Sequence, residues 1–267
     1  MASERVLGER ELNRALLARQ LLLERASASL PKALERIGGL QAQYAPSMYI
    51  GLAARVEGFE RVQLDRALGR RSVVQGTLLR ATIHLVSKGD YWPMAIAIRR
   101  ARREAWLNTS YRRDYTARQM AAAARTLRSR LGDGTMSRKE IHELLGEDST
   151  VTNGVNLWLD LVRVPPSGTW ERRRADLYAA AEHWLGPPLR LEESDAIELL
   201  VRRYLDGFGA GVAGRDRRLG GFAPPAAGVG AREAEASDLH DRERRRARRP
   251  SARSSAGPGY RLVQLHG

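Results

Sequence analysis

Residues 72–87 read SVVQGTLLRATIHLVS, a stretch rich in β-branched residues. Apolar and polar residues alternate through its second half: Leu79, Ala81, Ile83 and Leu85 are apolar, and Arg80, Thr82 and His84 are polar. Alternation with a period of two is typical of a half-buried strand. The stretch therefore predicts a pair of strands, with Arg80, Thr82 and His84 on one face of the second strand.

Short helices are predicted before this strand pair. An amphipathic helix is expected over residues 10–25, from the near-helical spacing of Leu12, Leu16, Leu22 and Leu23. Pro31 favours the start of a second helix, which Gly38–Gly39 should end. Further helices are expected at about 47–55 and after Gly58, the latter with Val62, Leu64 and Leu68 as its apolar residues. Helices followed by a two-stranded ribbon within 90 residues are typical of a winged helix, a DNA-binding variant of the helix-turn-helix.

The same pattern recurs further along the chain. Helices are expected at about 88–107 and 116–131, and Ser137 with Glu140 forms a capping-box signature for another. A further helix is expected in VNLWLDL (residues 155–161). Two short extended pieces then flank a turn made by Pro165, Pro166 and Gly168, before a helix that contains Trp184. These elements predict a second helix–helix–wing unit.

We therefore predict a mainly α fold with small β-wings (α+β), built from tandem winged-helix units. Residues 1–115 form the first unit with its trailing long helix, and residues 116–190 form the second. Residues 191–267 begin a third unit, with a helix over 192–208 whose apolar face comprises Ile197, Leu200, Val201 and Tyr204. This third unit is expected to be truncated or disordered.

From about Gly211 the apolar periodicity vanishes and glycine, alanine, proline, serine and arginine dominate. One interpretation is a native, disordered, basic tail. The favoured hypothesis is a shifted reading frame, because back-translation of two separated stretches with GC-rich codons, moved by one base, gives protein-like sequence. Gly209, Gly211 and Gly214 satisfy the pattern GxGxxG, but they follow a predicted helix rather than a strand, so no nucleotide cofactor is expected.

Charge and composition point to nucleic acid as the partner. The 267 residues include 45 basic and 31 acidic residues, a net charge of +14, as expected of a protein that binds phosphate-rich polymers. Almost all of the basic residues are arginine, a bias that a GC-rich coding sequence also produces. We expect double-stranded DNA as the partner of a monomer.

Other function classes are excluded by what the sequence lacks. There is no cysteine, which rules out disulfides, thiol nucleophiles and thiolate zinc sites. The five histidines show no metal-ligand spacing, so we expect neither a metal nor another cofactor. The N-terminus is charged from its fourth residue and no apolar run is long enough to span a bilayer. We expect a cytoplasmic, nucleoid-associated protein rather than a secreted or membrane protein.

Three stretches carry a resemblance to a known family: LERIGGLQAQYAPS (34–47), RATIHLV (80–86) and LVRVPPSGTWERRRADLY (161–178). They resemble the large bacterial family of winged-helix DNA-binding proteins that includes the alkyl-DNA glycosylases protecting antibiotic producers from azinomycin-type crosslinkers. The resemblance covers about residues 9–209. It implies tandem winged-helix units and a Gln-x-Gln or Gln-x-Asp motif at the catalytic position, which here falls on Gln41 and Gln43. The chain departs from the family by lacking a proper third unit.

The resemblance implies that Gln41 and Gln43 are catalytic. Gly38–Gly39 before them and Pro46 after them disfavour a continuous helix, and two residues separated by one point the same way in an extended segment. Neutral amide oxygens can orient a water molecule and stabilise an oxocarbenium-like sugar while a cationic alkylated or crosslinked base leaves. The alternative is that both glutamines only hold a loop.

Several arginines are candidates for DNA contacts. Arg80, Thr82 and His84 share a strand face and could contact phosphate or line a pocket beside the glutamines. Arg99 and Arg103 on the long helix, and Arg172, Arg173 and Arg174 after the turn, are candidates for phosphate binding, although a run of charge is also typical of a solvated face. Tyr44 could stack on a base. The alternatives to a glycosylase are a non-catalytic winged-helix DNA-binding module or regulator, and a family member inactivated by a frameshift.

Overall fold

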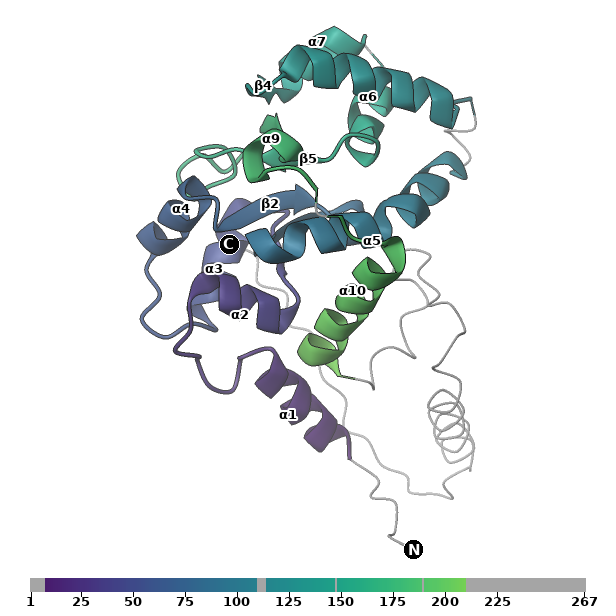
Figure 1. Ribbon diagram of the computed structural model, residues 1–267. Coiled ribbons are helices and arrows are strands. Elements are labelled where there is room, and N and C mark those ends of the chain that lie inside the picture. Colours follow the sequence, from purple (N-terminus) through teal and green to yellow (C-terminus); the bar gives the residue numbers. More distant parts are fainter. Residues whose placement is uncertain (1–7, 110–113, 147, 189, 210–267) are drawn as a thin grey trace, which may run out of the picture. The chain divides into compact units, whose positions relative to one another are not determined.

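One antiparallel sheet connects both halves of the described chain (Figure 1). The computed structural model describes residues 8–109, 114–146, 148–188 and 190–209, all within one of the two units into which the chain divides, Met1–Ala223. The strands follow the order β1-β3-β2-β5-β6-β4. Their bounds are β1 Leu40–Gln41, β2 Val73–Thr77, β3 Ile83–Ser87, β4 Met136–Ser137, β5 Leu161–Arg163 and β6 Leu177–Ala180.

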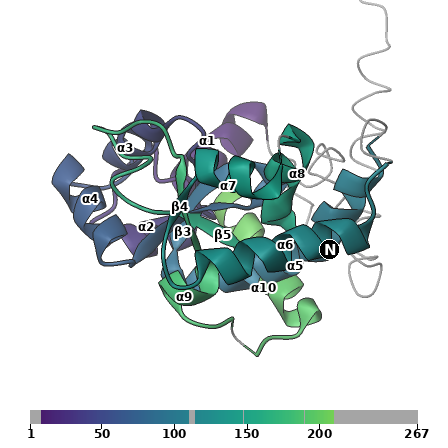
Figure 2. The same cartoon turned by 90° about the horizontal axis from the view of Figure 1, so that it is seen from above.

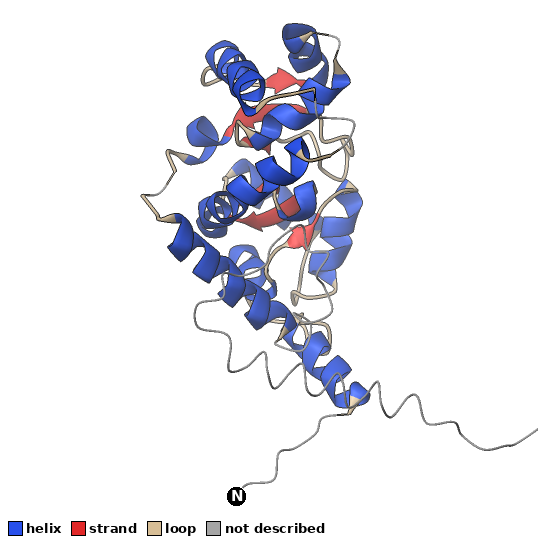
Figure 3. Ribbon diagram, turned by 90° about the vertical axis from the view of Figure 1, so that its right-hand side faces the viewer, coloured by secondary structure: helices blue, strands red, loops and turns tan. Residues whose placement is uncertain are grey.

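Helices cover this small sheet on both faces, as Figure 3 shows with the strands in red. The α-helices are α1 Glu9–Arg19, α2 Leu30–Ile37, α3 Ala45–Ala53, α4 Arg61–Gly69, α5 Lys88–Leu107, α6 Ala117–Leu131, α7 Arg138–Leu145, α8 Ser149–Gly154, α9 Ala181–Leu185 and α10 Glu193–Phe208. Short 3-10 helices are η1 Leu79–Ala81 and η3 Val155–Leu157. The predicted mainly α fold with a small β component is confirmed. The winged-helix assignment and the unit boundaries at 115 and 190 stay predictions.

The core divides because successive strand residues point to opposite faces of the sheet. On one face, Val74, Val86 and Val162 pack with residues of α5, α9 and α10. On the other face, Val73 and Leu85 pack with α2, α3 and α4, whereas Leu161 packs with α6 and α7. In Figure 2, α3 and α4 accordingly lie at one end of the sheet and α6 and α8 at the other.

Helix boundaries follow the predicted capping signals closely. Gly38 adopts the left-handed conformation, with φ 76°, and ends α2. The Ser87 hydroxyl accepts the Asp90 backbone N–H at the start of α5, and Ser137 with Glu140 forms the predicted capping box of α7. The long helix α5 therefore begins and ends where the sequence predicts.

Three local predictions about helices are wrong. The helix expected over 10–25 ends at Arg19, because Leu21 adopts a positive φ of 56°, so Leu22 and Leu23 lie outside it. Val62 does not join the apolar face of α4 and is 41% exposed. The helix expected over 155–161 is a 3-10 turn followed by β5, and the buried residues there alternate with the period of a strand: Val155, Leu157, Leu159 and Leu161.

Helix α10 packs on the first half of the chain, against α5 and α2. Leu200 is the buried member of its predicted apolar face, and Ala196, outside that predicted set, is buried as well. Arg203 donates to both carboxylate oxygens of the buried Asp90, at 2.9–3.2 Å, and so ties α10 to α5. The proposed frameshift and basic tail, with Gly211 and Gly214, lie outside the described residues.

Candidate functional site

Gln41 ends edge strand β1, and Gln43 lies in the extended segment that follows it. Strand β1 pairs with β3 through Leu40↔Leu85 and Gln41↔His84, and the pairing continues where the Ala42 N–H donates to the Ile83 carbonyl at 2.7 Å. Ala42 is buried, whereas Gln41 and Gln43 are exposed. The extended backbone therefore turns both amide side chains to the same side, as their spacing predicts.

The two amides have different partners. Gln43 Oε1 accepts the backbone N–H of Ile83 at 2.8 Å, a bond that closes the end of the β1–β3 pairing. Gln41 Oε1 accepts only a long hydrogen bond, 3.4 Å, from the Arg80 guanidinium. Because the Gln43 oxygen is held by the main chain, Gln41 has the carbonyl oxygen that is more available to a water molecule or a substrate.

The hairpin between β2 and β3 carries Arg80 at its turn. The sequence predicts a strand through residues 79–82, but residues 79–81 form η1, and Arg80 and Ala81 adopt positive φ values of 54° and 56°. The chain must reverse here, so Arg80 projects from a turn instead of a strand face. Left-handed non-glycine residues cost on the order of 1 kcal/mol or more, and such strain is concentrated at functional sites.

His84 lies directly opposite Gln41 and is buried. Its Nδ1 is 3.1 Å from the Thr82 carbonyl oxygen and 3.5 Å from the Thr82 hydroxyl. Burial, assisted by the nearby charge of Arg80, lowers the pKa of His84 below its ordinary value, so the ring is neutral near pH 7. With its proton on Nδ1, donated to Thr82, the ring leaves Nε2 as an acceptor. The structure thus gathers Arg80, Thr82 and His84 around Gln41.

We expect acid to destabilise the folded chain partly through His84. The pKa of this residue is lower in the folded than in the unfolded state, so its contribution to stability is complete above the unfolded pKa near 6.5 and is lost as the pH falls. Urea unfolding at about pH 5 and about pH 7.5 measures the loss. In His84→Asn the loss should be smaller, and an equal loss in both proteins would contradict this assignment.

The predicted second wing reaches the glutamine strand. In the loop between β5 and β6, the Trp170 backbone N–H donates to the Tyr49 hydroxyl at 3.2 Å, and the two rings meet edge to face at 5.7 Å. Arg173 donates to the Tyr44 hydroxyl at 3.2 Å, next to Gln43 in the chain. Arg173 therefore joins the residues around the glutamines. No local sequence signal could predict these contacts across more than 100 residues.

The other candidate arginines have intramolecular partners. Arg172 and Arg174 both pair with Asp176, at 3.2 and 3.4 Å. Arg99 pairs with Asp160 at 2.8 Å, and Arg103 donates to the Leu157 carbonyl at 2.8 Å. A DNA phosphate would compete with these partners at Arg99 and Arg103, and their predicted role in DNA binding stays a prediction.

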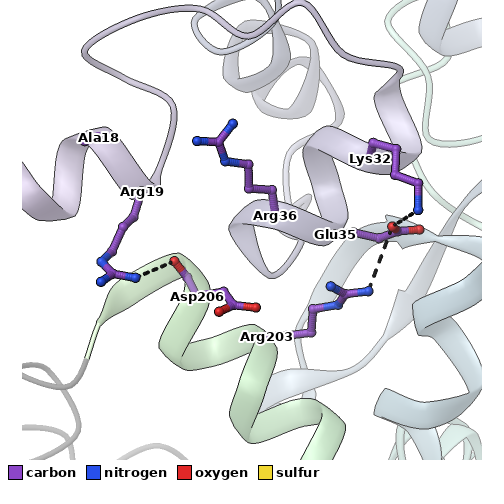
Figure 4. Close-up of a pocket in the computed structure, with 7 residues that line it drawn as sticks. All are labelled: Ala18, Arg19, Lys32, Glu35, Arg36, Arg203 and Asp206. Atoms are coloured by element: carbon purple, nitrogen blue, oxygen red, sulfur yellow. Dashed lines mark hydrogen bonds and ion pairs between the residues drawn. The ribbon is translucent and has the colours of Figure 1, made fainter.

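A polar pocket of about 590 Å³ lies among α1, α2 and α10 (Figure 4). It contains the ion pairs Lys32–Glu35 at 2.8 Å and Arg203–Glu35 at 3.9 Å. Arg19 donates to the carbonyls of Leu205 and Asp206 at its edge, both at 3.3 Å. No predicted site residue lines this pocket. The Arg203–Glu35 pair in this pocket joins α10 to α2, and the pocket shares no lining residue with the glutamine site.

Within the described parts of residues 8–209, no helix is both long enough and apolar enough to span a membrane. Over the same ranges, no three His, Cys, Asp or Glu side chains gather closely enough to hold a metal ion.

Comparison with known proteins gives a family and a fold. A family model described as "DNA glycosylase AlkZ-like" matches residues 34–263. The solved structure of the Streptomyces sahachiroi DNA glycosylase AlkZ is similar, with a TM-score of 0.64 and 20% sequence identity over 77% of this chain. The chain spans 58% of the length of that structure. None of the curated proteins compared matches the chain.

Proposed function

Because the chain belongs to the AlkZ-like DNA glycosylase family, we propose that it hydrolyses the glycosidic bond of alkylated or crosslinked bases in double-stranded DNA. The observation that carries the proposal is the pair of amides on one exposed side of β1, Gln41 and Gln43, with Arg80 and His84 beside them. Since its substrate is chromosomal DNA, the proposal also places the protein in the cytoplasm at the nucleoid.

The proposed mechanism uses a water molecule oriented by Gln41. In an N7-alkylguanine the bond from N9 to C1′ breaks, and its electron pair discharges the positive charge of the purine. The water oxygen bonds to C1′, and its extra proton passes to solvent. The amide dipoles stabilise the positive charge that develops on the sugar. Gln43, whose oxygen is held by the Ile83 N–H, fixes the strand on which Gln41 lies.

The amide site predicts a preference for cationic lesions. A glutamine is not a general base and the site offers no strong acid, so the leaving base must depart without being protonated. We expect release of 7-methylguanine from duplex DNA and no detectable release of the neutral O6-methylguanine from the same sequence context. Liquid chromatography of the free bases makes the comparison. Release of both bases at similar rates would show that the selectivity argument is wrong.

A second prediction concerns the wing arginines. Replacing Arg172, Arg173 and Arg174 together with alanine should reduce the slope of log affinity against log salt by about one, because a phosphate contact releases about one counterion. We attribute this loss to Arg173, since Asp176 holds the other two arginines. Fluorescence anisotropy of a labelled duplex over a salt series measures the slope. An unchanged slope would mean that these arginines are only solvated surface.

The alternative function is a DNA-binding module or regulator without catalysis. It is favoured by the commitment of the Gln43 oxygen to the Ile83 N–H. A chain of this kind would bind duplex DNA with a steep salt dependence and release no base. A family member inactivated by a frameshift would behave in the same way, and the nucleotide sequence around codons 205–215 distinguishes these two cases.

A further inference from the structure

A small cavity away from the glutamines carries two arginines and no acid. It lies among α7, α8, η3, β5 and β6 and measures about 90 Å³. Its polar lining includes Arg138, Thr152, Asn156, Arg163 and Tyr178, and its described lining contains no aspartate or glutamate. The positive charge at this cavity therefore has no acidic counterpart in its own wall.

Arg163 is the buried member of this lining, 6% exposed. Its Nη1 donates to the Thr77 hydroxyl oxygen at 2.7 Å, and its guanidinium stacks over the Tyr178 ring at 5.3 Å. Its Nε has no partner among the described residues, and no described carboxylate lies within ion-pair distance. Burial lowers the pKa of Arg163, and Tyr178 and Tyr91 oppose this shift in part. A guanidinium keeps its proton, so the charge stays in the interior without a carboxylate counterion among the described residues.

A second buried guanidinium lies beside Arg163. Arg102 donates to the Thr77 carbonyl, so two buried arginines meet at one residue. Arg102 has a carboxylate partner, Asp160, at 3.7 Å, which Arg99 shares at 2.8 Å. Arg163 has no such partner among the described residues, and a buried charge without a counterion is costly in a low dielectric. Arg163 is therefore the group that favours an anion at the cavity.

The unused hydrogen-bonding capacity at the cavity includes a donor of Arg163. Asn156 Nδ2 and Arg163 Nη1 both donate to the Thr77 hydroxyl oxygen, at 3.3 and 2.7 Å. Asn156 Oδ1, an acceptor, and Arg163 Nε, a donor, are buried without a partner among the described residues. Arg138 donates to Asn153 Oδ1 at 2.6 Å and has further guanidinium donors. The donor capacity for an anion is therefore that of the two arginines.

We propose that this cavity binds a phosphate group. The volume of the cavity equals that of about three water molecules at about 30 Å³ each, which is enough for one tetrahedral oxyanion. It is well below the roughly 150 Å³ of a cavity that accepts a benzene ring, so a DNA base does not fit. The planar fork of an arginine matches the geometry of phosphate oxygens. Arg138 lies at the exposed start of α7, where a phosphate can enter from solvent.

The sheet fixes the spacing between this cavity and the glutamines. The register pairs Gln41↔His84, His84↔Gly76 and Gly76↔Val162 form one row across four strands, and Arg163 follows Val162. Three strand spacings of about 4.8 Å amount to about 14 Å between the backbones. Because Arg163 follows Val162 in β5, its side chain lies on the sheet face opposite to that of Gln41, so a phosphate held here and a base at the glutamines would contact different faces of the sheet. The assignment of the phosphate to DNA rests on the proposed function, whereas phosphate binding itself does not.

The first experiment uses inorganic phosphate and the full chain. Phosphate should raise the melting temperature saturably, and Arg138→Ala, an exposed change, should weaken the apparent affinity about 10-fold, as loss of a charged contact does. Tyr178→Phe keeps the ring over Arg163 but removes the hydroxyl, and it should weaken the apparent phosphate affinity about 5-fold. Arg130→Ala removes an equal charge from exposed α6 surface and should change nothing. Unchanged phosphate affinity in both cavity variants would overturn the proposal.

The second experiment identifies the source of the phosphate. If DNA supplies it, Arg138→Ala should reduce the salt slope of duplex binding by about one relative to Arg130→Ala. Equal slopes, together with the weakened affinity of Arg138→Ala for inorganic phosphate, assign the cavity to free phosphate. Neither measurement requires base release, so a failure of the glycosylase proposal leaves this test intact.

Discussion

Gln41→Ala is expected to slow the release of an N7-alkylguanine from duplex DNA by about 10-fold or more, a loss of roughly 1.4 kcal/mol or more of transition-state stabilisation. Gln41 is exposed on β1, and its oxygen has only the 3.4 Å bond from Arg80 to give up. Removing the amide therefore removes a water-orienting group without unfolding the strand. Single-turnover release of the base measures the rate, and DNA affinity should change little.

The Gln43 variant separates a water-orienting role from a positioning role. Gln43→Ala breaks the 2.8 Å bond to the Ile83 N–H, so we expect reduced activity together with a lower unfolding midpoint, whereas Gln41→Ala should keep the midpoint. Gel-shift affinity for the same duplex is the control for binding. Undiminished base release in both single variants and the double variant would end the catalytic assignment of these residues.

Gly76→Ala is expected to lower the free energy of unfolding by about 3 kcal/mol, near the upper end of overpacking effects. A Cβ atom at this position in the centre of β2 would lie 2.5 Å from Cε2 of Tyr91. Tyr91 lies on α5 and its side chain is fully buried. Since Gly76 also pairs with His84, the same change should displace the strand that faces Gln41. Chemical denaturation at neutral pH measures the loss.

Gly69→Ala is the matched control. Gly69 lies at the end of α4, and no atom lies within 4 Å of the Cβ that alanine would add, so the change should be neutral or stabilising by up to about 1 kcal/mol. Adding Tyr91→Leu to Gly76→Ala should recover part of the lost stability, because it removes the clashing ring. Equal unfolding midpoints for the two alanine variants would contradict the packing described for β2 and α5.

Local signals predict the elements that hold the site. The capping residues Ser87 and Ser137 and the turn glycine Gly38 act within a few residues, so the bounds of α5, α7 and α2 follow from the sequence. The exposed pair Gln41 and Gln43 also follows, because their spacing and the flanking glycine and proline favour an extended segment.

Contacts between distant segments could not be predicted in this way. The β2–β5 pairing that joins both predicted strand pairs into one sheet, the bond from Trp170 to Tyr49 and the bond from Arg173 to Tyr44 depend on the tertiary fold. The positive φ values at Arg80 and Ala81 also could not be predicted, because neither residue is a glycine. In the sequence, nothing distinguishes Arg163 from the many other arginines of the chain. Its burial depends on which helices cover β5.

Direct detection of a freed base tests the central claim. The full chain is incubated in excess with duplex DNA that contains one 7-methylguanine, and the free base and the abasic strand are quantified by mass spectrometry. We expect saturable release of 7-methylguanine in amounts equal to the abasic sites, well above the spontaneous rate and reduced in Gln41→Ala. Tight, salt-dependent binding of the same duplex with no release above the spontaneous rate, for this and other cationic adducts, would contradict the glycosylase assignment and leave a DNA-binding module.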